Sequence, residues 1–322
     1  MRSVPPRLAI LLALGMALLF LAACGGAAPA DPTPPAGVEP TAPSGYPGWP
    51  PQDDGGELLP IPVTSELAVG QNRFLLNLVD RQNEPLAAPD RDVSLRFFDL
   101  AADPESPATT VEGTYLPTVP QLPGLYRAMV DFPRAGMWGV EVEATEPDGA
   151  TRSGRMVFSV QPTSSTPAVG ARAIASTTPT AATRDELARI STDTEPNPDF
   201  YRVSVDRALQ DGEPFLLFFG TPAFCKTATC GPAMDIIKDV AGEFEGDVTV
   251  IHVEPYELQQ VDGQLQPVLR EGQLVPVAPV VEWGLRTEPM LFAVDDEGVV
   301  RAKLEGVASV DEVRSAMTAI AP

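Results

Sequence analysis

The sequence predicts two folded domains, an all-β sandwich followed by an α/β domain. Between residues 59 and 161, apolar and polar side chains alternate with the period of half-buried strands. From residue 200 to 322, apolar runs of strand length alternate with helical patterns, as is typical of buried parallel strands and the helices that cover them. Two low-complexity segments, 24–58 and 162–199, flank the first domain.

The first 23 residues have the charge pattern of a secretory signal. Arg2 and Arg7 form a short basic region, and the apolar run over 8–21 is too short for a comfortable membrane span. A pair of small residues then precedes Cys24, which resembles the lipobox of bacterial lipoproteins. The resemblance implies cleavage before Cys24, a lipid on its sulfur and anchoring to the outer face of a membrane in the cell envelope. The alternative is an ordinary secretory signal with an incidental cysteine.

Composition excludes several classes of function. The chain has 22 basic and 44 acidic residues, a net charge of −22 that phosphate backbones repel, so no nucleic-acid partner is expected. Its single histidine, His252, rules out a multi-histidine metal site. No cofactor or metal ion is expected. With Cys24 lipidated, Cys225 and Cys230 remain as each other's disulfide partners in an oxidising compartment.

The two low-complexity segments are expected to connect domains. Residues 24–58 are rich in Pro, Gly, Ala, Ser and Thr and cannot bury enough apolar surface to offset the entropy of ordering. We expect a tether that holds the domains away from the membrane. Residues 162–199 are rich in Ser, Thr and Pro and are expected to form the linker between the domains.

Five short alternating segments predict the strands of the sandwich over 59–161. Their apolar positions are Phe74, Leu76 and Leu78; Val93, Leu95 and Phe97; Tyr126, Ala128, Val130 and Phe132; Trp138, Val140 and Val142; and Met156, Phe158 and Val160. Turn residues precede the last two segments, at 133–136 and 147–149. The run over 124–140 resembles the immunoglobulin-like domains of bacterial envelope proteins. We find no site in this domain and expect a spacer or a protein-contact module.

The C-terminal elements follow a different order. The patterns predict a helix over 204–209, a strand over 214–219, a helix carrying Met234, Ile237, Val240, Ala241 and Phe244, a strand over 248–253, a helical segment over 277–283, strands over 289–294 and 299–304, and a helix that opens with a Ser309–Glu312 capping box. The cysteines fall between the first of these strands and the helix that follows it.

The segment Phe218–Pro232, with its cysteines, resembles the active-site segment of the thioredoxin superfamily. The segment Arg286–Phe292 resembles the second signature of that family, in which a cis-proline precedes the third core strand. The resemblance covers 200–322 and implies a thioredoxin-like domain. It also implies that Pro289 and Glu288 lie near the cysteines and receive substrate chains.

Placement at a helix start suggests a reactive cysteine. Pro232 suits the first helical position, so Cys230 is expected at the helix N-terminus, where free N–H groups favour a thiolate. Lys226, beside Cys225, can add to this effect. We therefore expect thiol–disulfide exchange with extracytoplasmic proteins or a redox partner, with Cys230 attacking and Cys225 resolving.

Three features depart from thioredoxin. The spacing is Cys-x4-Cys, Phe224 replaces the usual tryptophan, and the acidic residue of the central strand falls within the apolar run Leu217–Phe219. The competing hypothesis is therefore a non-enzymatic surface binding module with a structural Cys225–Cys230 disulfide.

A copper chaperone is a further alternative. Phe219–Thr221 followed by two cysteines resembles the Sco-type family, which uses a Cys-x3-Cys pair and a distant histidine. The spacing differs, and His252 is expected to be a hydrogen-bonded strand residue. Glu254, at the end of the same strand, is expected near the cysteines as a solvated carboxylate; the alternative is that it acts on their protons.

Overall fold

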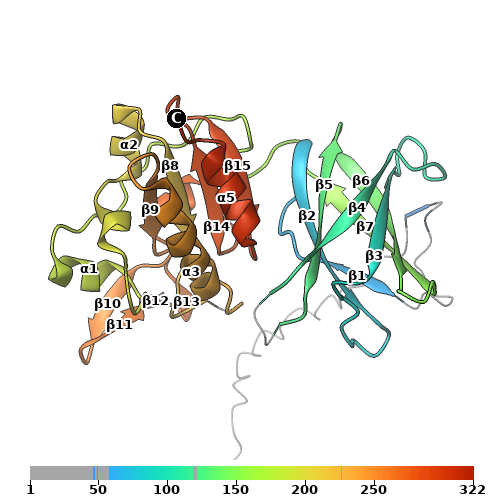
Figure 1. Ribbon diagram of the computed structural model, residues 1–322, viewed down its shortest axis with the longest axis horizontal. Helices are drawn as coiled ribbons and strands as arrows, with labels where there is room; N and C mark the ends of the chain where they lie inside the picture. The colour runs from blue at the N-terminus through green and yellow to red at the C-terminus, as the bar shows by residue number, and fades with distance from the viewer. Residues whose placement is uncertain (1–45, 48, 50–57, 119–121, 226) are drawn as a thin grey trace, which may run out of the picture. The chain divides into compact units, whose positions relative to one another are not determined.

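The computed structural model describes residues 46–47, 49, 58–118, 122–225 and 227–322. The expected signal peptide over 1–23, the lipidation site Cys24 and Lys226 lie outside these residues. The described chain is mostly β, with one seven-stranded antiparallel sheet, one four-stranded sheet, two small hairpins and several short helices (Figure 1). Within these ranges, no helix combines the length and hydropathy that a membrane crossing requires.

The seven-stranded sheet has the strand order β1-β2-β5-β4-β3-β6-β7. Its strands are β1 (Leu59–Pro62), β2 (Gly70–Val79), β3 (Asp92–Asp99), β4 (Thr109–Leu116), β5 (Leu125–Phe132), β6 (Gly136–Thr145) and β7 (Thr151–Val160). Strand β4 pairs with β3 through Thr109–Gly113 and with β5 through Thr114–Leu116. It therefore joins the two halves of the sheet, and we refer to residues 58–161 as the seven-stranded region.

The alternation seen in the sequence forms the core of this region. The apolar positions of β2, β3, β5 and β6 that alternate in the sequence are all buried in one cluster, and Met156 and Phe158 of β7 pack against it. The two edge strands approach one another at Gly154 of β7, where a Cβ atom would collide with the carbonyl oxygen of Leu58. The sheet is therefore nearly closed.

Three described residues of the expected tether, Tyr46, Trp49 and Leu58, pack against this sheet. Of residues 24–58, the structure describes Tyr46, Pro47, Trp49 and Leu58. The Trp49 ring is 2% exposed and lies 4.4 Å from the ring of Phe98, between centroids. Its place depends on Gly139, because a Cβ atom there would lie 2.7 Å from the indole. Trp49 therefore differs from the expectation of a spacer without large buried side chains.

The four-stranded sheet has the order β15-β14-β8-β9. Its strands are β8 (Phe215–Phe219), β9 (Thr249–Val253), β14 (Met290–Val294) and β15 (Val300–Glu305). β8 and β9 are parallel, whereas β14 is antiparallel to both of its neighbours. All residues of β8 and β14 are buried, as their uninterrupted apolar sequences predict.

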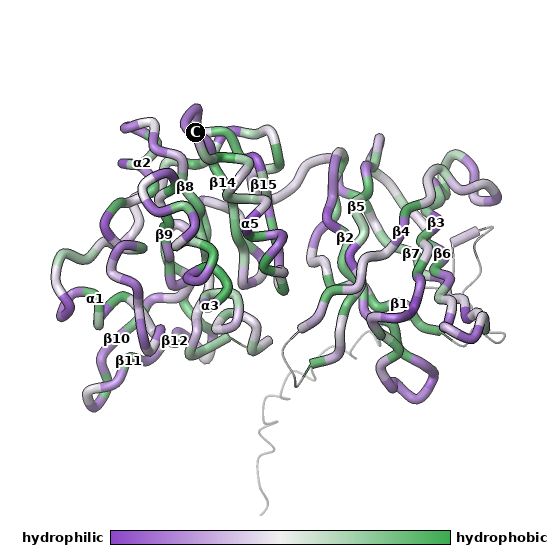
Figure 2. The backbone as a smooth tube through the Cα atoms, in the orientation of Figure 1, coloured by the Kyte–Doolittle hydropathy of each residue, from purple (hydrophilic) through white to green (hydrophobic). Residues whose placement is uncertain are grey.

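Helices cover both faces of this sheet. They are α1 (Arg184–Ile190), α2 (Val205–Asp211), α3 (Cys230–Ala241), α4 (Ala278–Glu282) and α5 (Val310–Thr318), with short 3₁₀ turns at Pro198–Tyr201 and Gly242–Phe244. α1, α3 and α5 pack with Leu216 and Phe218 on one face, and α2 packs with Phe215 and Leu217 on the other. Figure 2 shows the hydrophobic residues concentrated along β8, β9 and β14.

Two hairpins, which the sequence patterns do not predict, lie between β9 and α4. They are β10 (Leu258–Val261) with β11 (Gln264–Pro267), and β12 (Leu269–Arg270) with β13 (Gln273–Leu274). Their strands are mostly polar and at least partly exposed, so they lack the alternation by which a half-buried strand is recognised.

Parts of the expected linker over 162–199 pack against the four-stranded sheet, although most of its residues are exposed. Leu187 of α1 is 5% exposed within its core, and Ser176 and Thr178 are buried. The Ser176 hydroxyl accepts a hydrogen bond from Trp283 Nε1 at 3.2 Å, and the Thr178 hydroxyl accepts one from Val205 N at 3.1 Å. Low-complexity composition misleads here because the Ser and Thr hydroxyls serve as internal acceptors. We refer to residues 172–322 as the four-stranded region.

Candidate functional site

The register of the four-stranded sheet brings three separate segments to one edge. Phe219, the last residue of β8, pairs with Val253 of β9 and with Met290 of β14. The next residues outward are Glu254 on one side and Pro289 on the other, with the cysteine loop between them. The expected grouping of Pro289 and Glu254 around that loop therefore follows from strand pairing.

The two cysteines form a disulfide between this loop and the start of α3. Their Cα atoms are 6.0 Å apart. Cys230 is the first residue of α3 and is 0% exposed, whereas Cys225 is partly exposed. The loop is tied down by the amide of Cys225, which donates to the carbonyl of Thr221 at 3.1 Å. Ala228 has a φ of +57°, which completes the turn back to the helix.

The helix begins earlier than the sequence predicts. Pro232 is the third residue of α3, not the first. The first four N–H groups of a helix have no partner within it, so proline is tolerated throughout the first turn. Cys230 remains at the helix N-terminus, as expected.

The exposure of the sulfurs differs from the expected division of roles. A buried Cys230 cannot reach a protein substrate, whereas the partly exposed Cys225 can. The Cys225 sulfur lies 3.2 Å from the hydroxyl of Thr227, which in turn lies 2.7 Å from the hydroxyl of Thr229. The accessible side of the disulfide is therefore lined by hydroxyl groups.

Glu254 is buried, in contrast to the solvated carboxylate expected. It is 6% exposed, and one of its oxygens, Oε1, accepts hydrogen bonds from the amide of Thr192 at 2.7 Å and from the Thr192 hydroxyl. Its other oxygen, Oε2, has no hydrogen-bond partner among the described residues, nor has the hydroxyl of Thr221. Burial raises the pKa of Glu254 to about 7, and the hydrogen bonds of Thr192 and the nearby hydroxyl of Thr221, which does not reach hydrogen-bond geometry, lower it only in part.

The cover over Glu254 comes from the segment after α1. The Thr192 hydroxyl also accepts a hydrogen bond from the amide of Ala223 at 3.2 Å, which links Glu254 to the cysteine loop. Beside it, Asp193 pairs with Lys238 of α3 at 2.5 Å. The sequence assigned 191–193 to a linker, so nothing in it indicated that this segment would cover the carboxylate. An acidic residue directly after an apolar strand was the one available signal.

His252 is the hydrogen-bonded strand histidine that the sequence predicts. Its Nε2 lies 2.8 Å from the carbonyl oxygen of Gly220, and its Nδ1 lies 2.5 Å from the hydroxyl of Tyr201. Because a carbonyl only accepts, Nε2 carries the proton and Nδ1 accepts from Tyr201. Burial lowers the pKa of His252 to about 4, which keeps the ring neutral. Both nitrogens are thus engaged, which argues against a copper ligand.

Pro289 and Glu288 lie at the opposite side of the cysteine loop. The peptide bond between them is cis, and Pro289 lines a small apolar cavity together with Ala233 and Ile236 of α3. The carbonyl of Pro289 accepts from the amide of Gly306 at 2.9 Å. The Glu288 carboxylate accepts a hydrogen bond from Tyr256 at 2.9 Å, so this side chain is already held by the protein.

No group of three or more His, Cys, Asp or Glu side chains in the described ranges is arranged to hold a metal ion. The groups that the site does present are a disulfide, a helix N-terminus and a buried carboxyl group.

No protein-family model matches the chain, and no curated protein matches it. Among solved structures, the chain is similar to the crystal structure of MtrC from Shewanella baltica OS185, with 12% sequence identity and a TM-score of 0.22. The match covers 46% of this chain and 28% of that one.

Proposed function

We propose that the chain is a lipid-anchored, extracytoplasmic protein with an immunoglobulin-like sandwich and a thioredoxin-like domain that exchanges disulfides through Cys225 and Cys230. The observation that carries the proposal is the disulfide between the partly exposed Cys225 and the buried first residue of α3. The β15-β14-β8-β9 order and the cis-proline beside the cysteine loop support the thioredoxin-like interpretation.

The exposure of the sulfurs supports Cys225 as the cysteine that exchanges with substrates. A substrate thiolate attacks Cys225 Sγ, the Cys225–Cys230 bond breaks, and its electron pair stays on Cys230 Sγ. The mixed disulfide then carries the substrate on Cys225. A second substrate thiolate attacks the substrate sulfur of that bond and releases the Cys225 thiolate. The substrate is oxidised by two electrons and the protein is reduced to its dithiol; the reverse sequence reduces a substrate disulfide.

Two features of the site serve the Cys230 thiolate in this scheme. The free N–H groups of the first turn of α3 stabilise its negative charge. Glu254, whose pKa burial raises to about 7, is protonated in about half of the molecules at neutral pH and is a proton donor linked to the cysteine loop through Thr192. It thereby offers the carboxyl group that the apolar β8 strand lacks.

The competing function is a surface binding module with a fixed disulfide, and the full burial of Cys230 favours it. A redox titration of the full chain, followed by alkylation of free thiols, separates the two functions. A potential between about −270 and −120 mV, the range of known oxidoreductases, supports exchange. A potential below about −300 mV contradicts it and favours the structural bridge.

A further inference from the structure

An apolar groove lies beside the cysteine pair, with a cavity volume of about 250 Å³. The start of α3, the segment that leads into α5, and the residues after β4 of the seven-stranded region all line it. The residues that matter here are Thr229 and Pro232, Val307 and Val310, and Pro117 and Thr118. The two regions of the chain therefore build this groove together.

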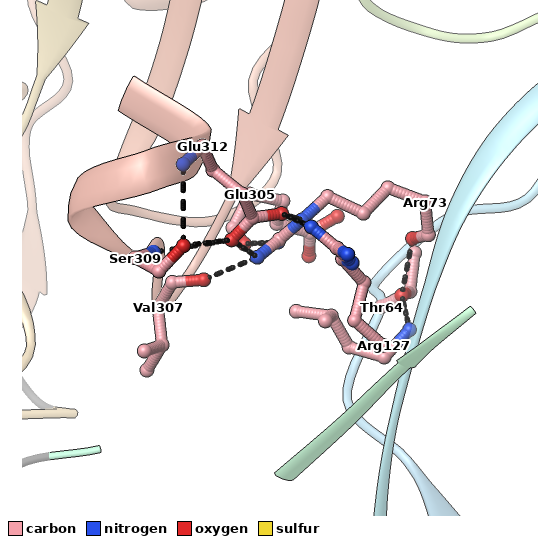
Figure 3. A network of polar contacts seen from close by, with 8 residues as sticks. Thr64, Arg73, Arg127, Glu305, Val307, Ser309 and Glu312 are labelled. Carbon is pink, nitrogen blue, oxygen red and sulfur yellow. Dashed lines mark hydrogen bonds and ion pairs between the residues drawn. The ribbon is translucent and has the colours of Figure 1, made fainter. Parts of the chain in front are cut away.

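Buried Arg73 of β2 fixes the wall formed by the α5 segment (Figure 3). Its guanidinium donates to the carbonyl oxygens of Glu305 at 2.7 Å and Val307 at 2.6 Å. Its Nε and Nη2 atoms also donate to the two carboxylate oxygens of Glu312, at 2.7 and 2.9 Å. Arg127 of β5 also pairs with Glu312, at 3.0 Å. Because Arg73 is itself only 6% exposed, it holds the backbone on which the groove depends.

The wall contributed by the seven-stranded region is also anchored. The Thr118 hydroxyl donates to the carbonyls of Leu122 at 2.7 Å and Pro123 at 3.0 Å. Leu122 is 38% exposed there, and Val310 on the α5 side of the groove is 41% exposed. Large aliphatic side chains are thus exposed on both regions near this site.

The groove is connected to the disulfide through Thr229, one of its lining residues. Thr229 directly precedes Cys230, and its hydroxyl contacts that of Thr227, which contacts the Cys225 sulfur. Among the described residues, no charged side chain lines the groove, although the chain carries a net charge of −22. Its volume is below the roughly 300–1,000 Å³ of small-molecule pockets. The lining suits a few aliphatic side chains of a polypeptide.

We infer that this groove binds an extended, apolar segment of the protein that exchanges disulfides with Cys225, and that the seven-stranded region supplies one of its walls. The inference rests on the proposed function and adds the class of substrate to it. It gives the seven-stranded region a part in substrate choice beyond that of a spacer.

The test is a binding measurement that does not depend on exchange. The probe is a short fluorescein-labelled peptide of alternating valine and serine around a central S-methylcysteine, which cannot form a disulfide. Its fluorescence anisotropy is titrated with the oxidised full chain. Val310→Glu and Pro117→Glu each place a charge in the groove from a solvent-accessible position, and we expect each to weaken binding at least tenfold.

Two matched variants serve as controls. Val281→Glu changes a valine that is 66% exposed on α4, and Pro107→Glu changes an exposed proline in the loop before β4; neither residue lines the groove. Both are expected to bind the peptide as the unmodified chain does. Absence of binding by the unmodified chain, or equal weakening by variants and controls, overturns the inference. Self-association that Val310→Glu abolishes also overturns it, because the groove would then hold a second copy.

The same variants separate this inference from the proposed function. Exchange of the reduced, unmodified chain with glutathione disulfide, without any binding of the peptide by the oxidised chain, refutes the groove and leaves the exchange activity standing. Peptide binding that responds to the groove variants, without exchange, supports the groove and refutes the activity.

Discussion

Thr192 donates both its backbone amide and its hydroxyl to a single oxygen of Glu254. The same hydroxyl accepts the amide of Ala223, two residues before Cys225. One carboxyl group thus connects the end of α1, the end of β9 and the cysteine loop. The protonation state of Glu254 is therefore expected to affect both the stability of the fold and the behaviour of the disulfide.

Glu254→Gln should remove the part of the pH dependence of stability that this carboxyl group contributes. Burial raises the pKa of Glu254 to about 7 from an ordinary 4.5, so the folded chain binds this proton more tightly than the unfolded chain. Below pH 4.5 both states are protonated. As pH rises from 4.5 through 7, the unfolded state loses its proton first, and the contribution of Glu254 to stability falls by about 3 kcal/mol. His252, whose pKa burial lowers to about 4, contributes in the opposite direction between pH 4 and 6.5. The contribution of Glu254 is therefore measured as the difference between the unmodified chain and the variant in urea unfolding at pH 5 and pH 8.

The control for that measurement is Glu245→Gln, which changes an exposed carboxylate. It should keep the pH dependence of the unmodified chain. A Glu254→Gln variant whose stability falls between pH 5 and 8 as steeply as that of the control would show that Glu254 titrates normally.

Single-cysteine variants should trap different amounts of substrate. Cys230→Ser leaves the partly exposed Cys225 free to form mixed disulfides that no internal thiol can resolve. Cys225→Ser leaves a thiol that is buried. We expect at least tenfold more mixed disulfide with Cys230→Ser when each is incubated with 5-thio-2-nitrobenzoate disulfide and read by mass spectrometry. Equal amounts of mixed disulfide would contradict the assignment of substrate exchange to Cys225, and a larger amount with Cys225→Ser would assign that exchange to Cys230.

Arg73→Met should destabilise the chain by about 3 kcal/mol. The change leaves the buried Glu312 carboxylate with Arg127 as its remaining ion-pair partner and leaves two backbone carbonyls without their donor. Arg96→Met is the matched control, because Arg96 also pairs with a glutamate but its side chain is 43% exposed. The control should cost below about 1 kcal/mol. Similar losses of unfolding free energy for both variants, measured by urea unfolding, would show that the buried contacts of Arg73 contribute no more than an exposed ion pair.

Gly139→Ala should displace Trp49. The added Cβ atom would lie 2.7 Å from the indole ring, and overpacking of this kind costs about 1–3 kcal/mol. Trp138 and Trp283 are buried elsewhere, so a red shift of tryptophan emission would report that Trp49 has left its site. Gly242→Ala, where a Cβ atom meets nothing within 4 Å, should leave the emission unchanged. An unchanged spectrum for Gly139→Ala would show that Trp49 is not docked there.

Strands were easier to predict than the segments between them. The alternation that includes Phe74, Phe97 and Trp138 indicated correctly which residues form the core of the seven-stranded sheet. The apolar run of β8 indicated a buried strand because five consecutive apolar residues have few other stable environments. The cis bond before Pro289 is also as predicted.

Burial of polar residues could not be predicted in the same way. Glu254 is covered by Thr192, and Thr192 belongs to a Ser/Thr/Pro-rich stretch whose composition is that of a solvated linker. Whether such a stretch packs depends on acceptors and donors supplied from distant parts of the chain, which local composition does not record. The relative exposure of Cys225 and Cys230 has the same origin, because helix placement sets charge stabilisation and not access.

The contacts of segment 172–199 determine where a stable fragment of the four-stranded region can begin. A fragment that starts at residue 200 would lose Ser176, the hydrogen-bond acceptor of the buried Trp283 indole, and would expose Glu254 to water by removing Thr192. Such a fragment would be less stable, and its carboxyl group would titrate as an ordinary acid. Recombinant forms of the C-terminal half should therefore begin before Arg172, whose bridge to Val299 is the first strand-like pairing of this half.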